Sequence, residues 1–373
     1  HAKVVFAFDD ERVKQADAQK CANTNHKPQK VVIIEKFHRF PAVLLVLIML
    51  IIMFPGMITG SSTAAVLSAG SIMAPVLALM GIDAVTSGSI IAMGALLGMI
   101  APPVNTAALI ICAGIDVPYV GFEGPLALIT FPLAILFVLL LGYKQARHMD
   151  YEKLKPALEK QDAIRKQYGV RIYIPLLVLV ALMVIFKVLK LGEDIGMPLM
   201  FLISAAVGLF TGKKINVLTA VPEAIRTAAP VMGILMGVGM FIEVMTATGV
   251  RGLVVISCLR LPSTLWLLAC AISIPLFGAV SSYGACSVLG VPFAYIYASL
   301  LGGNSVVVLA AISLIAAVGD MMPPTALAGL FAAQVTGVEK YTKILKRCIV
   351  PIIILLVYAC FFLANSKLIA GLF

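Results

Sequence analysis

The sequence predicts an all-α polytopic membrane protein, and three observations lead to this fold class. Of the 373 residues, 61% are hydrophobic and only 12% are charged, whereas soluble domains contain about 45–50% apolar and about 25% charged residues. The mean hydropathy is +1.05. Several apolar runs approach the ~20 residues that a helix needs to cross a bilayer, and the alternation typical of membrane β-strands is absent.

Two distant stretches share one pattern of polar and helix-breaking residues inside apolar sequence. Each has a Ser pair, a later Gly and a Pro pair: Gly60-Ser61-Ser62-Thr63, Gly98 and Pro102-Pro103 in the first; Ser281-Ser282, Gly319 and Pro323-Pro324 in the second. The spacing from the second Ser to the first Pro differs by a single residue. Such matched interruptions are typical of secondary transporters built from two related halves.

The apolar runs divide the chain into six segments in order. The chain begins with a polar lead-in and ends with a C-terminal helix. A linker with alternating charges lies in the middle, and we expect it to form a cytoplasmic surface helix. The remainder comprises two repeats, each with two arms around a break and a span interrupted by prolines, and the scaffold helices between them. The segments are 1–40 (lead-in), 41–142 (first repeat), 143–171 (linker), 172–261 (scaffold), 262–347 (second repeat) and 348–373 (C-terminal helix).

Basic residues orient this arrangement. If each arm–break–arm unit turns back and every other segment crosses once, four polar stretches fall on one side of the membrane. They hold 23 of the 28 Lys and Arg residues, and they are 1–40, 143–171, 212–227 and 336–347. The positive-inside rule makes this side cytoplasmic. The two repeats then enter from opposite faces and lie inverted, which is the arrangement behind alternating access.

The breaks predict binding sites, because irregular backbone survives at membrane depth only where it is buried in protein or lines a cavity. Backbone carbonyls with Ser and Thr hydroxyls suit Na⁺, and helix N-termini, which carry about +0.5 charge, suit a carboxylate. The expected cation site comprises Gly60, Ser61, Ser62, Gly98, Pro102, Ser281, Ser282, Gly319, Pro323 and Thr325. The expected substrate site comprises Thr63, Asn105, Thr106 and Asp320. The alternative is that small Ser and Gly residues only let helices pack closely.

Three acidic residues stand out in or beside the apolar runs. A mid-membrane Asp costs about 2.5–3.5 kcal/mol on insertion scales, so Asp320 needs a partner or a role. The alternatives are cation coupling (as a Na⁺ ligand or a proton carrier), a structural hydrogen bond, and a position at the cytoplasmic edge. Glu243 is a weaker candidate that can bond between helices or face a partner subunit. We expect Asp83 to cap a helix that starts near Val85.

The sequence offers no catalytic residues. The four histidines, His1, His26, His38 and His148, lie in polar segments, so they cannot form a His pair for a metal or activate the Ser pairs. No phosphate-binding loop occurs, and the cysteines form no C-x-x-C motif. We therefore expect no enzyme activity, no cofactor and no metal beyond Na⁺ as the coupling ion. The net charge is +10, but the basic residues lie in loops between spans. Membrane topology therefore explains this charge, and we expect no nucleic-acid partner.

At these motifs the chain resembles the large membrane subunit of tripartite ATP-independent periplasmic (TRAP) transporters, the DctM-type permeases of the ion-transporter superfamily. The resemblance covers residues 38–366 and rests on five motifs: Gly60–Ala64, Gly70–Pro75, Gly81–Asp83, Leu97–Pro103 and Gly319–Thr325. It implies that the Ser-containing breaks are tips of re-entrant hairpins, that the proline pairs interrupt discontinuous helices, and that both form the Na⁺ sites, with substrate between the halves.

The resemblance also implies a partner set and a location. Family members are symporters that use Na⁺ to import small carboxylates through an elevator-like shift. Helix N-termini and hydroxyls discriminate poorly between a dicarboxylate, a keto acid and a sugar acid, so which carboxylate this chain carries stays open. A periplasmic solute-binding protein delivers the substrate, and a small membrane subunit accompanies the large one in the bilayer. The implied location is the cell inner membrane of a bacterium or archaeon.

Three departures from the family leave alternatives open. The family has further N-terminal helices, so we expect a truncated N-terminus before His1. Asn105-Thr106 and Asp320 differ from common family residues, which leaves ion stoichiometry and substrate undecided. One alternative is a single-component Na⁺- or H⁺-coupled organic-anion transporter of the same superfamily. The other, from a different class, is an intramembrane enzyme or a passive assembly scaffold.

Overall fold

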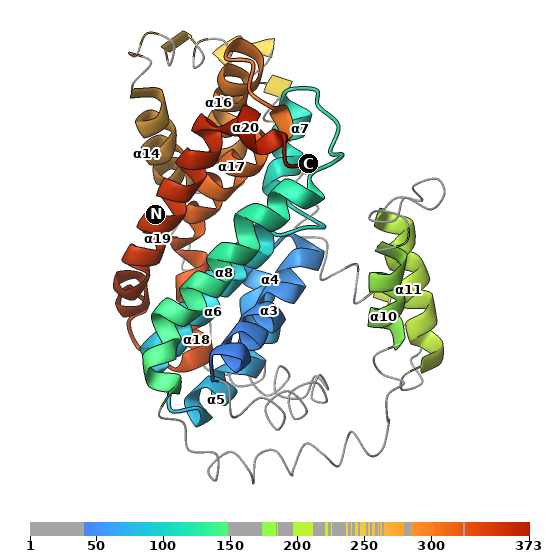
Figure 1. The fold of residues 1–373 in the computed structure, drawn as a ribbon, viewed down its shortest axis with the longest axis vertical. Helices are drawn as coiled ribbons and strands as arrows, with labels where there is room; N and C mark the ends of the chain where they lie inside the picture. Colours follow the sequence, from blue (N-terminus) through green and yellow to red (C-terminus); the bar gives the residue numbers. More distant parts are fainter. Residues whose placement is uncertain are drawn as a thin grey trace, which may run out of the picture. The chain divides into compact units, whose positions relative to one another are not determined.

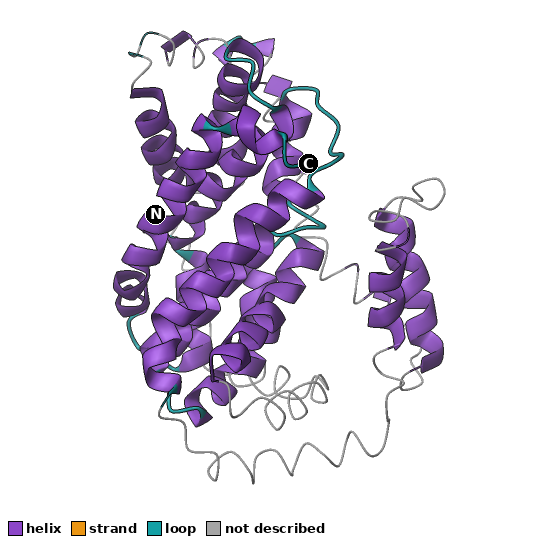
Figure 2. Ribbon diagram, in the orientation of Figure 1, coloured by secondary structure: helices purple, strands orange, loops and turns teal. Residues whose placement is uncertain are grey.

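The structure is a computed structural model that describes residues 41–147, 174–183, 197–211, 265–279, 285–323 and 325–373, with short stretches of one to four residues between 185 and 262. All regular elements in these ranges are helical (Figure 2). Two compact units divide them. One contains α10 (Ile174–Met183) and α11 (Met197–Thr211), and the other contains the helices described below.

Four helical stretches in the described residues are long and apolar enough to cross a membrane. They are Pro41–Thr59, Ser62–Leu79, Glu123–Ala146 and Tyr341–Ala364, with mean hydropathies between 1.7 and 2.7. Several shorter apolar helices accompany them. The predicted fold class, an all-α polytopic membrane protein, is therefore confirmed.

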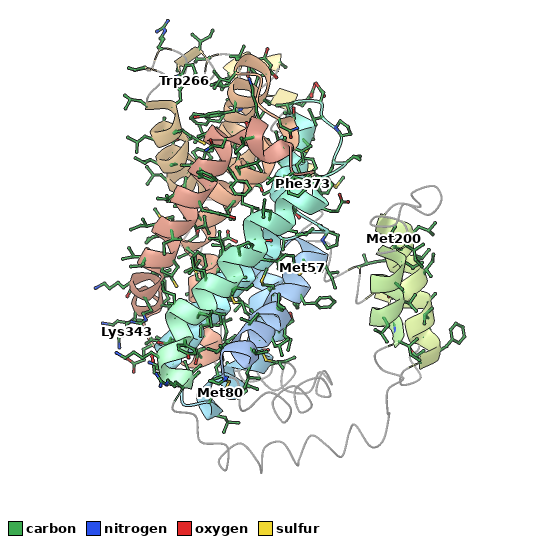
Figure 3. The ribbon with its side chains drawn as sticks, in the orientation of Figure 1. Met57, Met80, Met200, Trp266, Lys343 and Phe373 are labelled. Carbon is green, nitrogen blue, oxygen red and sulfur yellow. The ribbon has the colours of Figure 1, made fainter. Side chains whose placement is uncertain are left out.

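The first two arms form a hairpin. Helix α3 (Pro41–Thr59) is followed by Gly60, whose φ of +65° is a conformation that favours glycine. The chain returns through α4 (Ser62–Ala65), the π-helical turn η1 (Val66–Gly70) and α5 (Ser71–Leu79), and both α4 and η1 contact α3. In Figure 3, Met57 lies near mid-height and Met80 at the lower end, and Gly60 at the turn is buried.

Helix α6 (Ala84–Ile100) is the buried centre of the first half. The Asp83 carboxylate caps it by accepting from the Thr86 N–H at 3.0 Å, which confirms the predicted cap. Every residue from Thr86 to Ile100 is buried, as expected for a helix that is apolar all round.

The predicted break at Pro102-Pro103 follows α6. The two prolines, joined by a cis peptide bond, separate α6 from α7 (Thr106–Gly114), because proline lacks the N–H donor that a continuous helix needs. Helix α8 (Glu123–Ala146) then packs against α3 and α6, as Figure 1 shows.

The second half has a similar order of elements. It begins with α14 (Trp266–Gly278), η5 (Cys286–Gly290), α16 (Val291–Ala294) and η6 (Tyr295–Leu300). Its central helix α17 (Ser305–Ala317) is buried from Val307 onward, contacts α6, and ends in the 3₁₀ turn η7 (Val318–Met321) before Pro323. Helices α18 (Leu327–Thr336), α19 (Tyr341–Ala364) and α20 (Ser366–Ala370) complete it.

The first hairpin ends, and α14 begins, at opposite ends of this unit. Met80, directly after α5, lies at the lower end in Figure 3, whereas Trp266, the first residue of α14, lies at the upper end. Helices α14 and α16 both lie near the upper end in Figure 1.

Two helices differ in length from the prediction. Helix α8 continues through Tyr143 to Ala146, into the predicted linker, and α19 begins at Tyr341, whereas the apolar pattern begins at about residue 349. In both places charged and polar residues extend the helix beyond its apolar part, which hydropathy alone does not reveal. Residues 1–40, and the linker from 148 to 171, lie outside the described residues.

Candidate cation and substrate site

The tip of the first hairpin meets the end of the second central helix. The Ser62 hydroxyl donates a hydrogen bond to Oδ2 of Asp320, and the two residues are 2% and 5% exposed. Ser62 is the first residue of α4, whose N-terminus is capped by the Ser61 hydroxyl, and Asp320 lies in η7. One buried hydrogen bond therefore joins elements from both halves of the sequence.

The same hairpin tip touches the start of α7. A Cβ on Gly60 would lie 2.0 Å from the Thr106 hydroxyl oxygen, so only glycine lets the tip approach this closely. Thr106 is 3% exposed and opens α7 directly after the proline loop. Gly60 and Thr106, which the sequence assigned to cation and substrate respectively, are thus neighbours.

Asn105 ties the first proline loop to α17. Its Nδ2 donates to the Ile100 carbonyl at 3.2 Å and to the Ser313 hydroxyl at 2.8 Å, and its Oδ1 accepts from the Ala108 N–H at 2.9 Å. The residue is completely buried. Its side chain caps α7 and bridges the two halves at once.

Each proline loop is fastened to the arm that precedes its hairpin tip. In the first half the Val104 N–H, directly after the proline pair, donates to the Met57 carbonyl at 3.2 Å. In the second half Thr325, at the matching position, donates both its N–H (3.4 Å) and its hydroxyl (2.6 Å) to the Ala279 carbonyl. The two halves therefore share one contact between arm and loop.

Close glycine crossings bring these loops and arms together. A Cβ on Gly98 would lie 2.5 Å from the Met53 carbonyl oxygen, and a Cβ on Gly319 would lie 2.6 Å from Cα of Gly278. Both glycines precede their proline pair by four positions. A side chain at either position would clash with backbone atoms of the neighbouring arm. Each glycine is therefore required for the arm to pack this closely against its discontinuous helix.

The other predicted site residues have more varied surroundings. Pro102 is half-buried, whereas Pro323 is exposed. Thr63 is half-buried on α4 and makes no side-chain hydrogen bond within the described part of the chain. Ser281 and Ser282 lie outside the described residues, so the second hairpin tip is not placed. Glu243 is exposed.

Sequence reasoning missed two residues that complete the network. Ser313 accepts from Asn105 and donates to the Ala310 carbonyl at 2.8 Å, and it precedes Asp320 by two helical turns in an otherwise apolar run, which is a readable signal. Tyr119 contacts the first proline loop from the loop between α7 and α8, and no sequence motif marks it.

The assembled groups are hard oxygen donors. Carboxylate, hydroxyl and backbone carbonyl oxygens are the ligands that alkali and alkaline-earth cations prefer. Helix α6 ends at Ile100, so carbonyls of its last turn lack intrahelical partners. Among the described residues, no three His, Cys, Asp or Glu side chains gather where they could hold a metal ion.

A comparison with known families decides the identity of this arrangement. The family model described as "Tripartite ATP-independent periplasmic transporter, DctM component" matches residues 36–366, which is nearly the whole chain. The chain belongs to this DctM family. A search of curated proteins found no match. The DctM match includes both proline loops, the first hairpin tip and Asp320, and it makes the chain a component of a membrane transporter.

A second contact network in the DctM chain joins Asp83, directly before α6, to Gln145 near the end of α8. The Gln145 amide donates to Asp83 Oδ1 and its carbonyl accepts from the Asp83 N–H at 3.1 Å. Burial alone raises the pKa of the Asp83 carboxyl, but the Thr86 N–H, the Gln145 amide and the Arg347 charge together hold this pKa below its usual value. This network connects the start of α6 with the end of α8 and the start of α19.

Proposed function

We propose that this chain is the large permease subunit of a secondary active, Na⁺-coupled importer of small carboxylates. A periplasmic solute-binding protein delivers the carboxylate, and a small membrane subunit assembles with the chain in the inner membrane of a bacterium or archaeon. Family membership supports the role of permease component. The coupling ion, the substrate class and the partners are the proposal.

The hydrogen bond between Ser62 and Asp320 is the single observation that carries the cation assignment. A buried carboxylate needs compensating donors or a cation, because transferring an unpaired charge out of water is strongly unfavourable. Here one compensating donor is the Ser62 hydroxyl at the first hairpin tip, and its bond joins oxygen atoms from the two halves of the sequence. A cation bound among these oxygens would neutralise Asp320 and hold the hairpin to η7.

The substrate carboxylate is assigned to the start of α7. Helix N-termini carry free N–H groups and a partial positive charge, which suit an anion without any Lys or Arg. The Asn105 side chain uses its three hydrogen bonds to cap α7 and to contact Ile100 and Ser313, so we assign it a structural role at this site. Thr106 and Thr63 remain the candidates for direct contact with the carboxylate.

Transport follows from the arrangement of the two halves. With the basic loops cytoplasmic, the first hairpin opens to the cytoplasm and the second to the periplasm, as two inverted repeats. An elevator-like shift of the hairpins and discontinuous helices against the scaffold helices would expose the site to each side in turn. Cation binding closes the hairpin tip and permits this shift.

Thermal unfolding of the purified chain against Na⁺, with K⁺ at the same ionic strength as control, tests the proposal. A ligand at 100 times its Kd stabilises the folded state by about 2.7 kcal/mol. We expect a Na⁺-specific rise in Tm that Ser62→Ala and Asp320→Asn each weaken. Ser71→Ala is the matched control, because its hydroxyl bonds only local carbonyls in the same hairpin arm. Equal responses to Na⁺ and K⁺ in wild type would refute Na⁺ coupling.

A second candidate is a single-component organic-anion transporter coupled to H⁺, and the buried Asp320 favours it as a carboxyl that can carry a proton. Uptake into proteoliposomes separates the two. Uptake by the chain alone that follows a pH gradient, and is lost in Asp320→Asn, would favour this candidate. Uptake that requires the binding protein, the small subunit and Na⁺ would support the first.

A further inference from the structure

The loop between α7 and α8 reaches back to the first proline loop. Its outer residues Val120 and Gly121 are exposed, and Val120 is 67% exposed. Its inner residues are Tyr119 and Phe122, whose rings stack with centroids 4.6 Å apart and an interplanar angle of 13°. Phe122 is 1% exposed and precedes α8, so the Tyr119 ring rests on a fixed, buried partner.

The Tyr119 hydroxyl makes two hydrogen bonds to the proline loop. It donates to the Pro103 carbonyl at 3.2 Å and accepts from the Asn105 N–H at 3.2 Å. A phenolic hydroxyl has one proton to donate, so these two bonds use it fully as donor and acceptor. The two backbone groups flank Val104, whose own N–H is bonded to the Met57 carbonyl.

Each of residues 103–105 therefore has a backbone group with a hydrogen-bond partner. Tyr119, which lies outside the two repeat motifs, is the partner of both Pro103 and Asn105. Directly after this stretch, Thr106 lies against Gly60 of the hairpin tip. The position of Thr106 and of the first N–H groups of α7 depends on the conformation of the three residues before it. Removing the Tyr119 hydroxyl leaves the Pro103 carbonyl and the Asn105 N–H without their partner.

We propose that Tyr119 is a positioning residue that holds the first proline loop in its binding conformation. It touches neither cation nor carboxylate; it acts through Pro103 and Asn105 on the oxygen and N–H groups that do. Ordering a loop before binding increases affinity, because the ordering cost is met in the free protein. This inference rests on the proposed Na⁺-coupled function.

The test compares Tyr119→Phe with Tyr358→Phe in the purified chain. Tyr358 is the matched control, because its hydroxyl also donates to a backbone carbonyl, that of Leu128, at 3.1 Å, far along the sequence from the proline loop. The measured quantities are Tm without Na⁺ and the Na⁺ concentration at half-maximal Tm shift. We expect Tyr119→Phe to lower Tm more than Tyr358→Phe, because it leaves two buried backbone groups unpaired, and only Tyr119→Phe to raise the half-maximal Na⁺ concentration, by about threefold to tenfold.

Phe122→Leu is a second variant, which keeps the hydroxyl and removes the ring that Tyr119 stacks on. We expect it to raise the half-maximal Na⁺ concentration in the same direction, and it keeps the inference testable if Tyr119→Phe does not fold. A Na⁺ titration unchanged from wild type in the folded variants overturns the positioning role alone. A wild-type protein without any Na⁺-specific shift overturns the proposed coupling, and the inference with it.

Discussion

Ser62 and Asp320 lie 258 positions apart in the sequence, yet the Ser62 hydroxyl donates a hydrogen bond to the Asp320 carboxylate in a buried site. The bond joins the residue after the first hairpin turn to the 3₁₀ turn that precedes Pro323. A change in the charge of Asp320 should therefore alter the hydrogen bond that holds the hairpin tip, and a movement of the tip should alter the surroundings of Asp320.

A double-mutant cycle on this pair measures the coupling. Bonds to charged groups contribute about 1.5–3 kcal/mol, so Ser62→Ala should lower the free energy of unfolding by that amount. In the Asp320→Asn background the same change should cost less, and the two effects should fail to add by about 1 kcal/mol or more. Denaturation of the four proteins in detergent provides the measurement.

The control cycle pairs Asp320→Asn with Ser89→Ala. Ser89 is equally buried, but its hydroxyl bonds locally, to the Val85 carbonyl one turn earlier in α6 at 2.8 Å. Its effect should add to that of Asp320→Asn. If the Ser62 cycle is additive as well, the hydrogen bond does not couple the two halves.

The glycine crossings predict a second set of effects. Gly98→Ala and Gly319→Ala each place a methyl group within 2.5–2.6 Å of backbone atoms, which cannot turn aside as a flexible side chain would. Each should lower the free energy of unfolding by about 1–3 kcal/mol or more. In Gly208→Ala the nearest atom, on Pro175, would be 3.6 Å away, so this helical control should be neutral or up to about 1 kcal/mol more stable. Equal Tm values for all three variants would contradict the crossings.

The sequence could predict the helices, their breaks and the Asp83 cap, because these depend on local chemistry. Proline removes a donor wherever it stands, and an Asp before an apolar run finds the free N–H groups of the first turn. The ends of α8 and α19 were harder, since the polar residues around Lys144 and Lys343 extend each helix without an apolar signal.

The pairing of site residues could not be predicted in the same way. Asp320 was singled out because a carboxylate inside an apolar run is costly, but nothing in the sequence says which hydroxyl reaches it. Asn105 was assigned to substrate by its position after the prolines, whereas its side chain caps α7 and bonds to Ser313. Tyr119 stands in a short loop whose return to Pro103 only the three-dimensional structure reveals.

Asn105 yields a third prediction through its amide. In Asn105→Asp an oxygen replaces Nδ2, so an acceptor would face the Ile100 carbonyl, and the bond that Nδ2 donates to Ser313 would be lost. Because the site is fully buried, we expect a loss of about 3 kcal/mol or more in the free energy of unfolding. Denaturant unfolding provides the measurement.

Asn304→Asp is the control for this substitution. Asn304 caps α17 by accepting from the Val307 N–H at 3.1 Å, but it is exposed and its amide bridges nothing in the described residues. Asp caps helices as well as Asn and its charge suits an N-terminus, so stability should stay level or rise slightly. Equal losses at the two positions would mean that the bridge to Ser313 contributes nothing.

The contacts of Asp83 predict an acid-dependent part of the stability. Its folded pKa lies below the ordinary 3.8, so its ionised form stabilises the folded state at higher pH, and this contribution is lost as pH falls through the folded pKa. Asp83→Asn lacks the contribution at every pH. The Tm difference between wild type and Asp83→Asn should therefore be constant from about pH 5 to pH 7 and shrink below about pH 4. A Tm difference for Asp83→Asn that stays the same down to about pH 3 would show that its charge is not what stabilises the junction of α6, α8 and α19.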